Sequence, residues 1–244
     1  ENLGLTVGNN MAYEMLSPLS PDFVMILNND TEVEPDTLAR LTGFLDTNPD
    51  ACVAAPVVTF ASRPDRIWSA GGRFSRWRMR LFQTYRTLSD LPDEPVRIQQ
   101  ATGCAMMMRW KDYARVSMQD PDLFLYYDDN DLCFKVEQAG GTIYLVPGSV
   151  VAHHVSVTVG GVLSPFAIYF THRNRALVAL RYLKPMEKAA FLAYYIGVTL
   201  VKTLVYPIRR RGDLVRWMWL GAVHGLSNRS GLRPAALFLR EKSP

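Results

Sequence analysis

The chain has 244 residues, enough to bury a sizeable core, and its 48% hydrophobic and 20% charged residues exclude a disordered protein. The charge is uneven: residues 1–170 hold 13 basic and 20 acidic residues (net −7), whereas residues 171–244 hold 14 and 3 (net +11). The basic part also carries aromatic residues and an apolar run, which favours an anionic membrane surface over nucleic acid as its partner.

The start of the sequence and the number of cysteines give two further expectations. The first residue is Glu1, and the opening ENLGLTVGNN is typical of the middle of a fold, so we expect the natural N-terminus to be missing. Cys52, Cys104 and Cys133 are odd in number and far apart. They exclude a disulfide framework or a thiolate zinc site and predict three buried thiols in a reducing compartment.

The first 155 residues alternate strand and helix patterns, which predicts an α/β sheet. We expect strands over 23–27, 52–60, 101–108, 142–146 and 150–154, and helices over about 35–45 and 129–139. The first strand is predicted to be buried on both faces, and Pro56 to mark a bulge or an edge. Gly140-Gly141 should end the second helix. Residues 61–100 predict an irregular excursion with a hairpin around Gly71-Gly72.

The C-terminal part reads as helix throughout. Helices are predicted over 165–183, 186–206 and 214–226, with Pro207 and the Arg209-Arg210-Arg211 cluster between the last two. Residues 189–208 have roughly the twenty-residue length of a membrane span, but Lys202 interrupts them. A helix lying in the membrane interface is the favoured interpretation, with a true span and a soluble packing helix as alternatives. We therefore expect a catalytic domain over 1–164 and a basic helical region over 165–244.

Asp30 follows the first predicted strand, where ligands bind in open α/β sheets. A carboxylate there can hold a divalent cation against a diphosphate, because Mg²⁺ prefers one or two carboxylates plus substrate phosphates. Asn28 offers a donor and an acceptor to a ribose or a base edge. The alternative is that Asn28-Asn29-Asp30 is only a turn and helix cap.

Asp128, Asp129 and Asp131 form a second candidate site. Such a cluster of carboxylates is stable at a helix N-terminus or beside a cation. Because it follows the apolar stretch 124–127, partial desolvation should raise a carboxyl pKa and produce a good general base. The alternative is a solvated helix cap with an acidic first turn.

His153 and His154 end an apolar strand about 24 residues later. Adjacent strand residues point to opposite faces, so one of the two can face a given site. A neutral imidazole there could ligate the same cation or contact a phosphate. The alternative is a structural histidine.

Six segments in register resemble the family 2 glycosyltransferases, in the branch typified by bacterial rhamnosyltransferase-like enzymes. The resemblance covers residues 1 to about 183. Its motifs are matched by Glu1–Gly4 with Gly8–Asn10, Leu27–Thr31 with Pro35–Leu38, Gly103–Arg109, Leu123–Cys133 with Lys135 and Gly140, Pro147 with His153, and Arg173-Asn174.

The resemblance implies a GT-A fold, a Rossmann-like mixed sheet flanked by helices, here without its first βαβ segment. It implies an inverting transfer from a nucleotide-diphospho-sugar, with dTDP-rhamnose as the branch's donor, to a glycan or polyprenyl-linked acceptor in cell-surface polysaccharide synthesis. Asp129 would be the base, and Asp128 and Asp131 would orient the base or the acceptor. Mg²⁺ or Mn²⁺ would be held by Asp30 and His153. The nucleotide would be bound by Asn2, Gly8, Asn10, Asn28 and Arg173.

Three positions depart from the family pattern: Asn28 stands in place of an aspartate, Asp128 in place of a glutamate and Lys135 in place of an arginine. The C-terminal helices would dock the enzyme on the cytoplasmic face of the membrane. Two other functions share parts of this pattern, namely a metal-dependent sugar nucleotidyltransferase and a non-catalytic, membrane-docked carbohydrate-binding domain.

Overall fold

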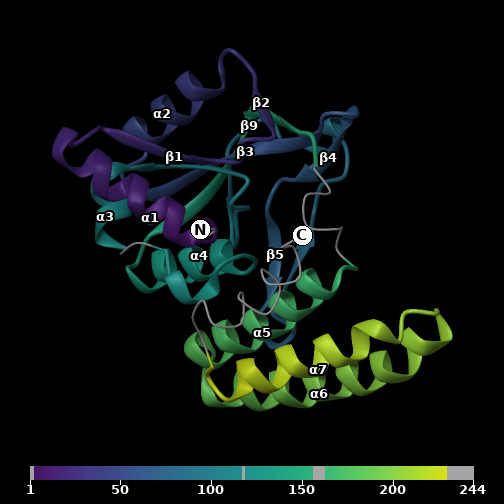
Figure 1. Cartoon of the computed structure of the whole chain (residues 1–244). Helices are drawn as coiled ribbons and strands as arrows, with labels where there is room; N and C mark the ends of the chain where they lie inside the picture. Colours follow the sequence, from purple (N-terminus) through teal and green to yellow (C-terminus); the bar gives the residue numbers. More distant parts are fainter. Residues whose placement is uncertain (1–2, 117–118, 156–162, 230–244) are drawn as a thin grey trace, which may run out of the picture.

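A mixed β-sheet forms the centre of the protein (Figure 1). The structure, a computed structural model, describes residues 3–116, 119–155 and 163–229. The main strands lie in the order β1–β8–β3–β9–β2, with β4 beside the end of β3 and β7 beside the beginning of β9. Among the described strands, only β3 and β9 pair in parallel. The bounds are β1 Phe23–Leu27, β2 Thr31–Val33, β3 Ala51–Phe60, β4 Arg63–Ser69, β7 Val96–Ile98, β8 Ala105–Arg109 and β9 Thr142–His153.

Helices cover both faces of this sheet, which confirms the α/β class. On one face α2 (Thr37–Thr47) packs Leu41 and Leu45 against the sheet. On the other face lie α1 (Leu5–Leu16), α3 (Trp110–Arg115) and α4 (Asp128–Gln138). The side chains of β8 alternate between these two layers, as the period of a strand requires: Met106 and Met108 face α4, and Met107 faces α2.

Two expectations about the first strand and helix are wrong in detail. The strand β1 lies at the edge of the described sheet and pairs only with β8, so it is half-buried rather than buried on both faces. Helix α2 begins at Thr37 with Asp36 as its N-cap, two residues after Pro35. Leu38, expected in the apolar stripe, is 49% exposed. Leu38 is in the first turn of α2, and the residues of α2 that are buried are Thr37, Leu41 and Leu45.

Residues 142–153 form one strand where the sequence predicts two. Strand β9 runs without a break from Thr142 to His153, and Pro147-Gly148 forms an irregularity inside it. The pairing changes from Pro56 with Val146 to Val57 with Val150, so β9 bulges beside Pro56. Pro56 has no N–H to donate, and the predicted bulge is confirmed at this position. The turn expected at Pro147-Gly148 is therefore a bulge in a continuous strand.

Residues 61–100 are more regular than the sequence suggests. Strand β4 continues the sheet, and a separate hairpin joins β5 (Gly72–Ser75) to β6 (Arg80–Gln83) through the 3-10 helix η2 (Arg76–Arg78). Gly71-Gly72 leads into this hairpin and is not its turn, which corrects the expectation. Further 3-10 turns are η1 Ser17–Leu19, η3 Leu88–Asp90 and η4 Pro121–Leu123. These short pairings have weak sequence periodicity, because their stability comes from contacts with β3 and with the C-terminal helices.

Helix α4 and the three cysteines follow the sequence expectations. Helix α4 ends at Gln138, where Gly140 adopts a φ of 75° and the N–H of Gly141 donates to the carbonyl of Val136 at 2.9 Å. The three cysteines are buried and free. Their role as small apolar core residues is confirmed.

Three helices close the other end of the molecule, below α4 in Figure 1: α5 (Pro165–Tyr182), α6 (Pro185–Ile208) and α7 (Asp213–Leu226). Helix α5 begins at its cap Ser164, whose hydroxyl accepts the N–H of Ala167 at 3.1 Å. Helix α7 approaches α5 closely because Gly221 and Gly225 have no side chain. A Cβ at Gly221 would lie 2.5 Å from the carbonyl oxygen of Tyr169.

Helix α6 has two different faces. Phe191, Tyr195 and Thr199 are buried against the rest of the protein. Lys202 also faces inward, because its Nζ lies 3.4 Å from Nε2 of His172 on α5. The charge that interrupts the apolar run in the sequence therefore does not interrupt the outer face. That face is defined by Met186, Ile196, Leu200, Val201, Leu204 and Ile208, which are all exposed.

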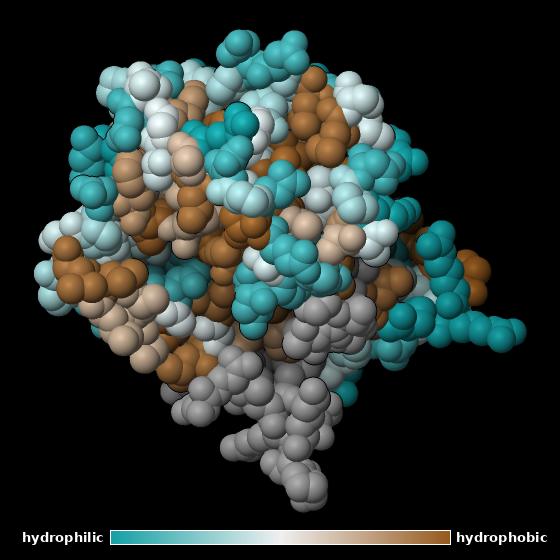
Figure 2. Space-filling view, turned by 90° about the horizontal axis from the view of Figure 1, so that it is seen from above, coloured by the Kyte–Doolittle hydropathy of each residue, from teal (hydrophilic) through white to brown (hydrophobic). Residues whose placement is uncertain are grey.

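By length and composition alone, α6 could cross a membrane, and 22% of its most apolar window is buried. At about 1.5 Å per residue its 24 residues extend about 36 Å. The turn between α6 and α7, residues 209–212, contains the arginine cluster. Seen from above, this turn projects beyond the sheet and its helices, and much of the projection is hydrophilic (Figure 2).

Candidate active site

One edge of the sheet brings Asp30 and His153 together. Strands β1 and β9 run in the same direction, so the Asp30 segment after β1 and the end of β9 meet at this edge. The Nε2 atom of His153 lies 3.2 Å from Oδ1 of Asp30. The ring of Trp68 on β4 packs edge-on against the imidazole at 4.6 Å between centroids. Of the two adjacent histidines, His153 is thus the one at Asp30, while His154 pairs with Glu32 at 2.7 Å.

Asp30 and His153 could bind a divalent cation whose remaining ligands come from a substrate. Neighbouring ligands of an octahedral Mg²⁺, each at 2.0–2.1 Å, lie about 3 Å apart, close to the separation of Nε2 and Oδ1. The Nδ1 atom of His153 is buried and has no hydrogen-bond partner within the described chain. No group of three or more His, Cys, Asp or Glu side chains within residues 3–116, 119–155 and 163–229 could hold a metal by itself. Phosphate oxygens would have to supply the remaining ligands.

The loop that precedes β8 connects this pair to the acidic cluster. The N–H of Asn28 donates to the carbonyl of Cys104 at 2.9 Å, and the N–H of Gly103 donates to Oδ2 of Asp129 at 3.3 Å. Burial, and next the negative charge of Asp30, raise the pKa of Cys104 to about 12. Residues 103–104 therefore lie between the two predicted sites. A Cβ at Gly103 would come within 3.3 Å of Cβ of Asp129, so a glycine lets the loop and the acid approach.

Asp128 and Asp129 occupy the first turn of α4 and differ in environment. Asp128 is 5% exposed, and burial, followed by the charge of Asp129, raises its pKa to about 7. Burial also raises the pKa of Asp129, although the N–H groups of Gly103 and Asn130 oppose the shift by hydrogen bonding to the carboxylate. Asp129 is only half-buried. It is therefore the member of the pair that a substrate can reach, and its raised pKa suits a general base.

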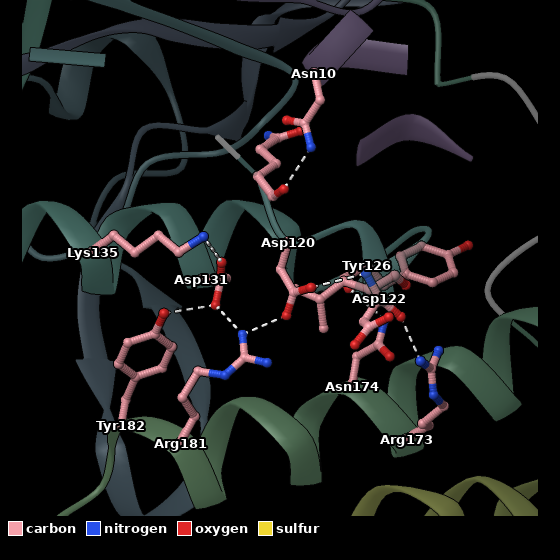
Figure 3. Close-up of polar contacts among 12 residues, drawn as sticks. Asn10, Asp120, Asp122, Tyr126, Asp131, Lys135, Arg173, Asn174, Arg181 and Tyr182 are labelled. Atoms are coloured by element: carbon pink, nitrogen blue, oxygen red, sulfur yellow. Dashed lines mark hydrogen bonds and ion pairs between the residues drawn. The ribbon is translucent and has the colours of Figure 1, made fainter. Parts of the chain in front are cut away.

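Asp131 is fully buried and belongs to a network that fixes α4 (Figure 3). Its carboxylate pairs with Lys135 at 2.8 Å and Arg181 at 2.8 Å, and it accepts the hydroxyl of Tyr182 at 2.7 Å. The Arg181 guanidinium also pairs with Asp120 at 2.5 Å, before η4. The network thus ties α4, α5 and the segment before η4 together. It places Asp131 among protein partners on the side of α4 away from solvent.

The segment that delivers the acids is strained. Phe124, Tyr126 and Tyr127 have φ values of 63°, 68° and 63°, which non-glycine residues rarely adopt. Phe124 is the centre of a γ-turn closed by the N–H of Leu125 on the carbonyl of Leu123 at 2.7 Å. Such strain persists only where surrounding contacts impose it, and it concentrates at functional sites.

Asn174 supplies those contacts. Its Nδ2 lies 2.8 Å from each of the carbonyl oxygens of Leu123, Leu125 and Tyr126. Asn174 is 0% exposed on α5, and its Nδ2 rather than its Oδ1 faces the three carbonyls because only the NH2 group can donate to them. Sequence reasoning missed this role. The only signal was the Arg173-Asn174 motif, which does not show which backbone groups the amide meets.

The residues expected to bind the nucleotide lie in different parts of the structure. Arg173 is fully buried and donates to the carbonyls of Asp122 and Arg229. Asn10 on α1 donates to the carbonyl of Gln119 at 2.8 Å. Gly8 is exposed on α1, Asn28 is half-buried beside Cys104, and Asn2 lies outside the described residues. The structure therefore brings Asn28 to Asp30, Asp129 and His153, while Asn10 holds Gln119 before η4 and Arg173 holds Asp122 within it.

An open cleft of about 430 Å³ lies at Asp129. Trp68, Gln83, Tyr126, Tyr127 and Thr171 also line it. Because Trp68 contacts His153 as well, the cleft borders the Asp30–His153 pair. A second cavity, of about 370 Å³ between Arg76, Arg97 and Glu137, contains none of these acids. Of these two cavities, the cleft at Asp129 is therefore the candidate active site.

The structure thus places a carboxylate–histidine pair at the carboxyl ends of the strands, beside a cleft that contains Asp129. Residues 1–178 match the family described as "Glycosyltransferase like family 2". The chain therefore belongs to this glycosyltransferase family.

Solved structures agree with the fold. The chain is similar to the protein in "Crystal structure of GalNAc-T7 with UDP, GalNAc and Mn2+", with a TM-score of 0.59 and 16% identity. The match covers 99% of this chain and 45% of that one, so the chain spans less than half the length of this relative. The similarity shows that the two share the GT-A fold. A comparison with curated proteins finds no match.

Proposed function

We propose that the protein is an inverting glycosyltransferase that moves a sugar from a nucleotide-diphospho-sugar to a hydroxyl group of a glycan or lipid-linked acceptor. The observation that carries the proposal is the loop at residues 103–104, which hydrogen-bonds to Asp129 on one side and to the Asp30 segment on the other. A base and a diphosphate site must flank the reacting carbon from opposite sides in such a displacement. Family membership supports the same reaction class.

Asp129 is assigned as the base. It takes the proton from the acceptor hydroxyl while that oxygen bonds to the anomeric carbon and the bond to the leaving diphosphate breaks. Asp131 positions Asp129 by fixing α4. Asp128 precedes Asp129 in the same helical turn, where the two carboxyl groups interact electrostatically.

The donor diphosphate is assigned to the edge of the sheet at Asp30 and His153, with Asn28 beside the nucleotide. A divalent cation bound there would offset the charge that develops on the leaving diphosphate. The relative GalNAc-T7 was crystallised with UDP and Mn²⁺, which supports a cation and a nucleotide in this fold. We propose Mg²⁺ or Mn²⁺ as the cation and dTDP-rhamnose as the donor.

The base is tested by Asp129→Asn, with Asp46→Asn as a matched control because Asp46 is exposed on α2. A panel of nucleotide sugars that includes dTDP-rhamnose should identify a donor, and Asp129→Asn should lower kcat by about 10² or more while donor binding stays. Release of a nucleoside diphosphate from the nucleotide sugar identifies glycosyl transfer. Formation of a nucleotide sugar from a nucleoside triphosphate and a sugar 1-phosphate, with release of inorganic diphosphate, would instead identify a nucleotidyltransferase. Normal turnover by Asp129→Asn would refute the assignment.

The donor site is tested by calorimetry. With Mn²⁺ present, Asp30→Ala should bind dTDP at least tenfold more weakly than the parent protein, while thymidine binding stays the same. A chelator should have the same effect on the parent protein. If dTDP binds equally well with and without metal, Asp30 and His153 are not a cation site.

We also propose that the helical region 165–244 docks the catalytic unit 1–164 on the cytoplasmic face of a membrane. The outer face of α6 is apolar over the full helix, and the projecting turn after it holds three consecutive arginines. Each basic residue near an anionic surface contributes about 1 kcal/mol, and buried apolar side chains add to this.

Liposome co-sedimentation tests the docking. Binding should rise with anionic lipid, fall with salt and be lost when Leu200 and Leu204 are both replaced by glutamine. The control replaces Leu38 and Leu88, which are exposed elsewhere, by glutamine. Equal loss in both variants, or no binding by the parent protein at low salt, would contradict the proposal.

A further inference from the structure

A cluster of four cations lies between the β5–β6 hairpin, α5 and α6. It consists of Arg78, Arg80, Arg175 and Lys202, which we call the basic cluster. The Nε atom of Arg175 donates to the carbonyl of Arg78 at 3.1 Å, and its guanidinium stacks over the ring of Tyr194 on α6 at 5.3 Å. The guanidinium of Arg78 lies over the same ring at 5.8 Å. Two arginines from different elements are thus fixed at one aromatic side chain.

Within the described residues, no acidic side chain neutralises the basic cluster. None of its four members forms an ion pair with an acid in the described parts of the chain. Nε of Arg78 is buried and has no hydrogen-bond partner there. The neighbouring His172 adds no charge, because burial lowers its pKa to about 3. Burial and the charges of Arg175 and Arg80 also lower the pKa of Lys202. Arg78, Arg175 and Lys202 are half-buried and Arg80 is exposed. Mutually repelling cations in such a place are an arrangement that an anionic ligand would stabilise.

The cluster adjoins the Asp129 cleft through Tyr127. Tyr127 lines the cleft, and its hydroxyl donates to the carbonyl of Met79, between Arg78 and Arg80 in the chain. Arg175, Asp129 and Arg80 all act electrostatically on the Tyr127 hydroxyl. On α5, Thr171 lines the cleft and Arg175 follows one helical turn later. The base and the cations therefore both adjoin Tyr127.

The cluster also adjoins exposed apolar side chains of the hairpin, while Lys202 itself faces α5, away from the outer face of α6. Trp77 of the hairpin packs edge-on against Tyr194 of α6 at 5.3 Å between ring centroids. On the hairpin, Trp77 and Phe82 beside the arginines are about 40% exposed, at 42% and 40%. In Figure 1 the strand β5 runs from the level of the sheet to the helices, so the hairpin spans the distance between the cleft and α6.

The geometry points to a binding site for the phosphate or diphosphate of a lipid-linked acceptor. This inference rests on the proposed function. From the cleft towards the helices, the protein presents the base Asp129, then the basic cluster, then exposed apolar side chains of the hairpin and of α6. A lipid-linked acceptor presents a sugar hydroxyl, then a phosphate, then a hydrocarbon chain in the same order. We assign Arg80 and Lys202 as phosphate ligands, because Arg175 already donates to the hairpin backbone.

Direct binding tests the site independently of catalysis. The probes are farnesyl diphosphate, farnesol and inorganic diphosphate, measured by calorimetry with a chelator present so that no cation can recruit a diphosphate to Asp30. The parent protein should bind farnesyl diphosphate at least tenfold more tightly than either other probe. The double variant Arg80→Gln, Lys202→Gln should lose this preference, whereas Arg209→Gln, Arg210→Gln, which removes the same charge beyond the end of α6, should keep it.

Each other result has a definite meaning. Equal binding of inorganic and farnesyl diphosphate shows a general anion site and overturns the lipid assignment. Equal loss of farnesyl diphosphate binding in both double variants shows a non-specific charge effect and overturns the site. If the cluster variant loses anionic-liposome binding but keeps its preference for farnesyl diphosphate, the cluster binds membrane headgroups instead. Should no donor be turned over while farnesyl diphosphate binding follows Arg80 and Lys202, glycosyl transfer fails and the lipid-phosphate site stands.

Discussion

Asp128 provides a test of the electrostatics at the start of α4. The substitution Asp128→Asn keeps the shape of the side chain and removes its ionisation. In the folded protein burial, and next the charge of Asp129, raises the Asp128 pKa from 3.8 to about 7. We therefore expect the variant to be more stable than the parent protein at alkaline pH.

The size and direction of the effect follow from proton linkage. Between the unfolded and the folded pKa the folded state binds a proton that the unfolded state has lost, so stability falls as pH rises through this window. The shift of about three units corresponds to about 4 kcal/mol in total. Between pH 5 and pH 7 the parent protein should lose about 2 kcal/mol of this, and the remaining loss should level off above pH 7, where Asp128 is fully ionised in both states. Asparagine does not titrate and escapes the loss.

Urea unfolding followed by tryptophan fluorescence at pH 5, 6, 7 and 8 measures the difference. The advantage of Asp128→Asn over the parent protein should grow by about 3 kcal/mol from pH 5 to pH 8. Asp46→Asn, at an exposed position, should show no such trend. A difference that stays constant over this pH range would refute the buried, protonated state of Asp128.

Three further substitutions test the packing around the site. Asn174→Asp places an oxygen against three carbonyls and should cost about 2–4 kcal/mol of stability and lower kcat, measured by urea unfolding and steady-state kinetics; unchanged values would contradict the clamp. Gly221→Ala should cost about 1–3 kcal/mol in thermal unfolding, because its Cβ would lie 2.5 Å from the Tyr169 carbonyl oxygen, whereas Gly197→Ala, with no atom within 4 Å, should cost nothing. Gly103→Ala should lower kcat and change the free energy of unfolding only slightly, because the new Cβ would lie 3.3 Å from Cβ of Asp129. A loss of stability without a loss of kcat would show that Asp129 takes no part in the reaction.

The sequence predicted most elements whose pattern is local. The helices α4, α5, α6 and α7 and the strands β1 and β3 lie where their apolar spacing and caps place them. Segment 61–100 was not predictable in the same way. Strand β4 and the β5–β6 hairpin form because of partners distant in the chain, and their short sequences carry little period of their own.

In the candidate site, too, local features were predictable from the sequence, whereas contacts between distant segments were not. The sequence alone placed Asp30 after a strand and His153 at the end of another, since both are local features. That they meet at 3.2 Å depends on the order of β1, β8, β3 and β9 in the sheet. The inward direction of Lys202 is also a tertiary fact, because a sequence of mixed apolar and basic residues does not say which side of α6 faces α5.

The acidic cluster shows the difference most directly. The sequence by itself determined that three carboxylates share the first turn of one helix. Tertiary structure decided that Asp128 is buried with a raised pKa, Asp129 opens into the cleft and Asp131 is fixed by Lys135 and Arg181. The physical reason is that successive helical residues point about 100° apart, so each carboxylate meets a different neighbour, and those neighbours come from segments far away in the chain.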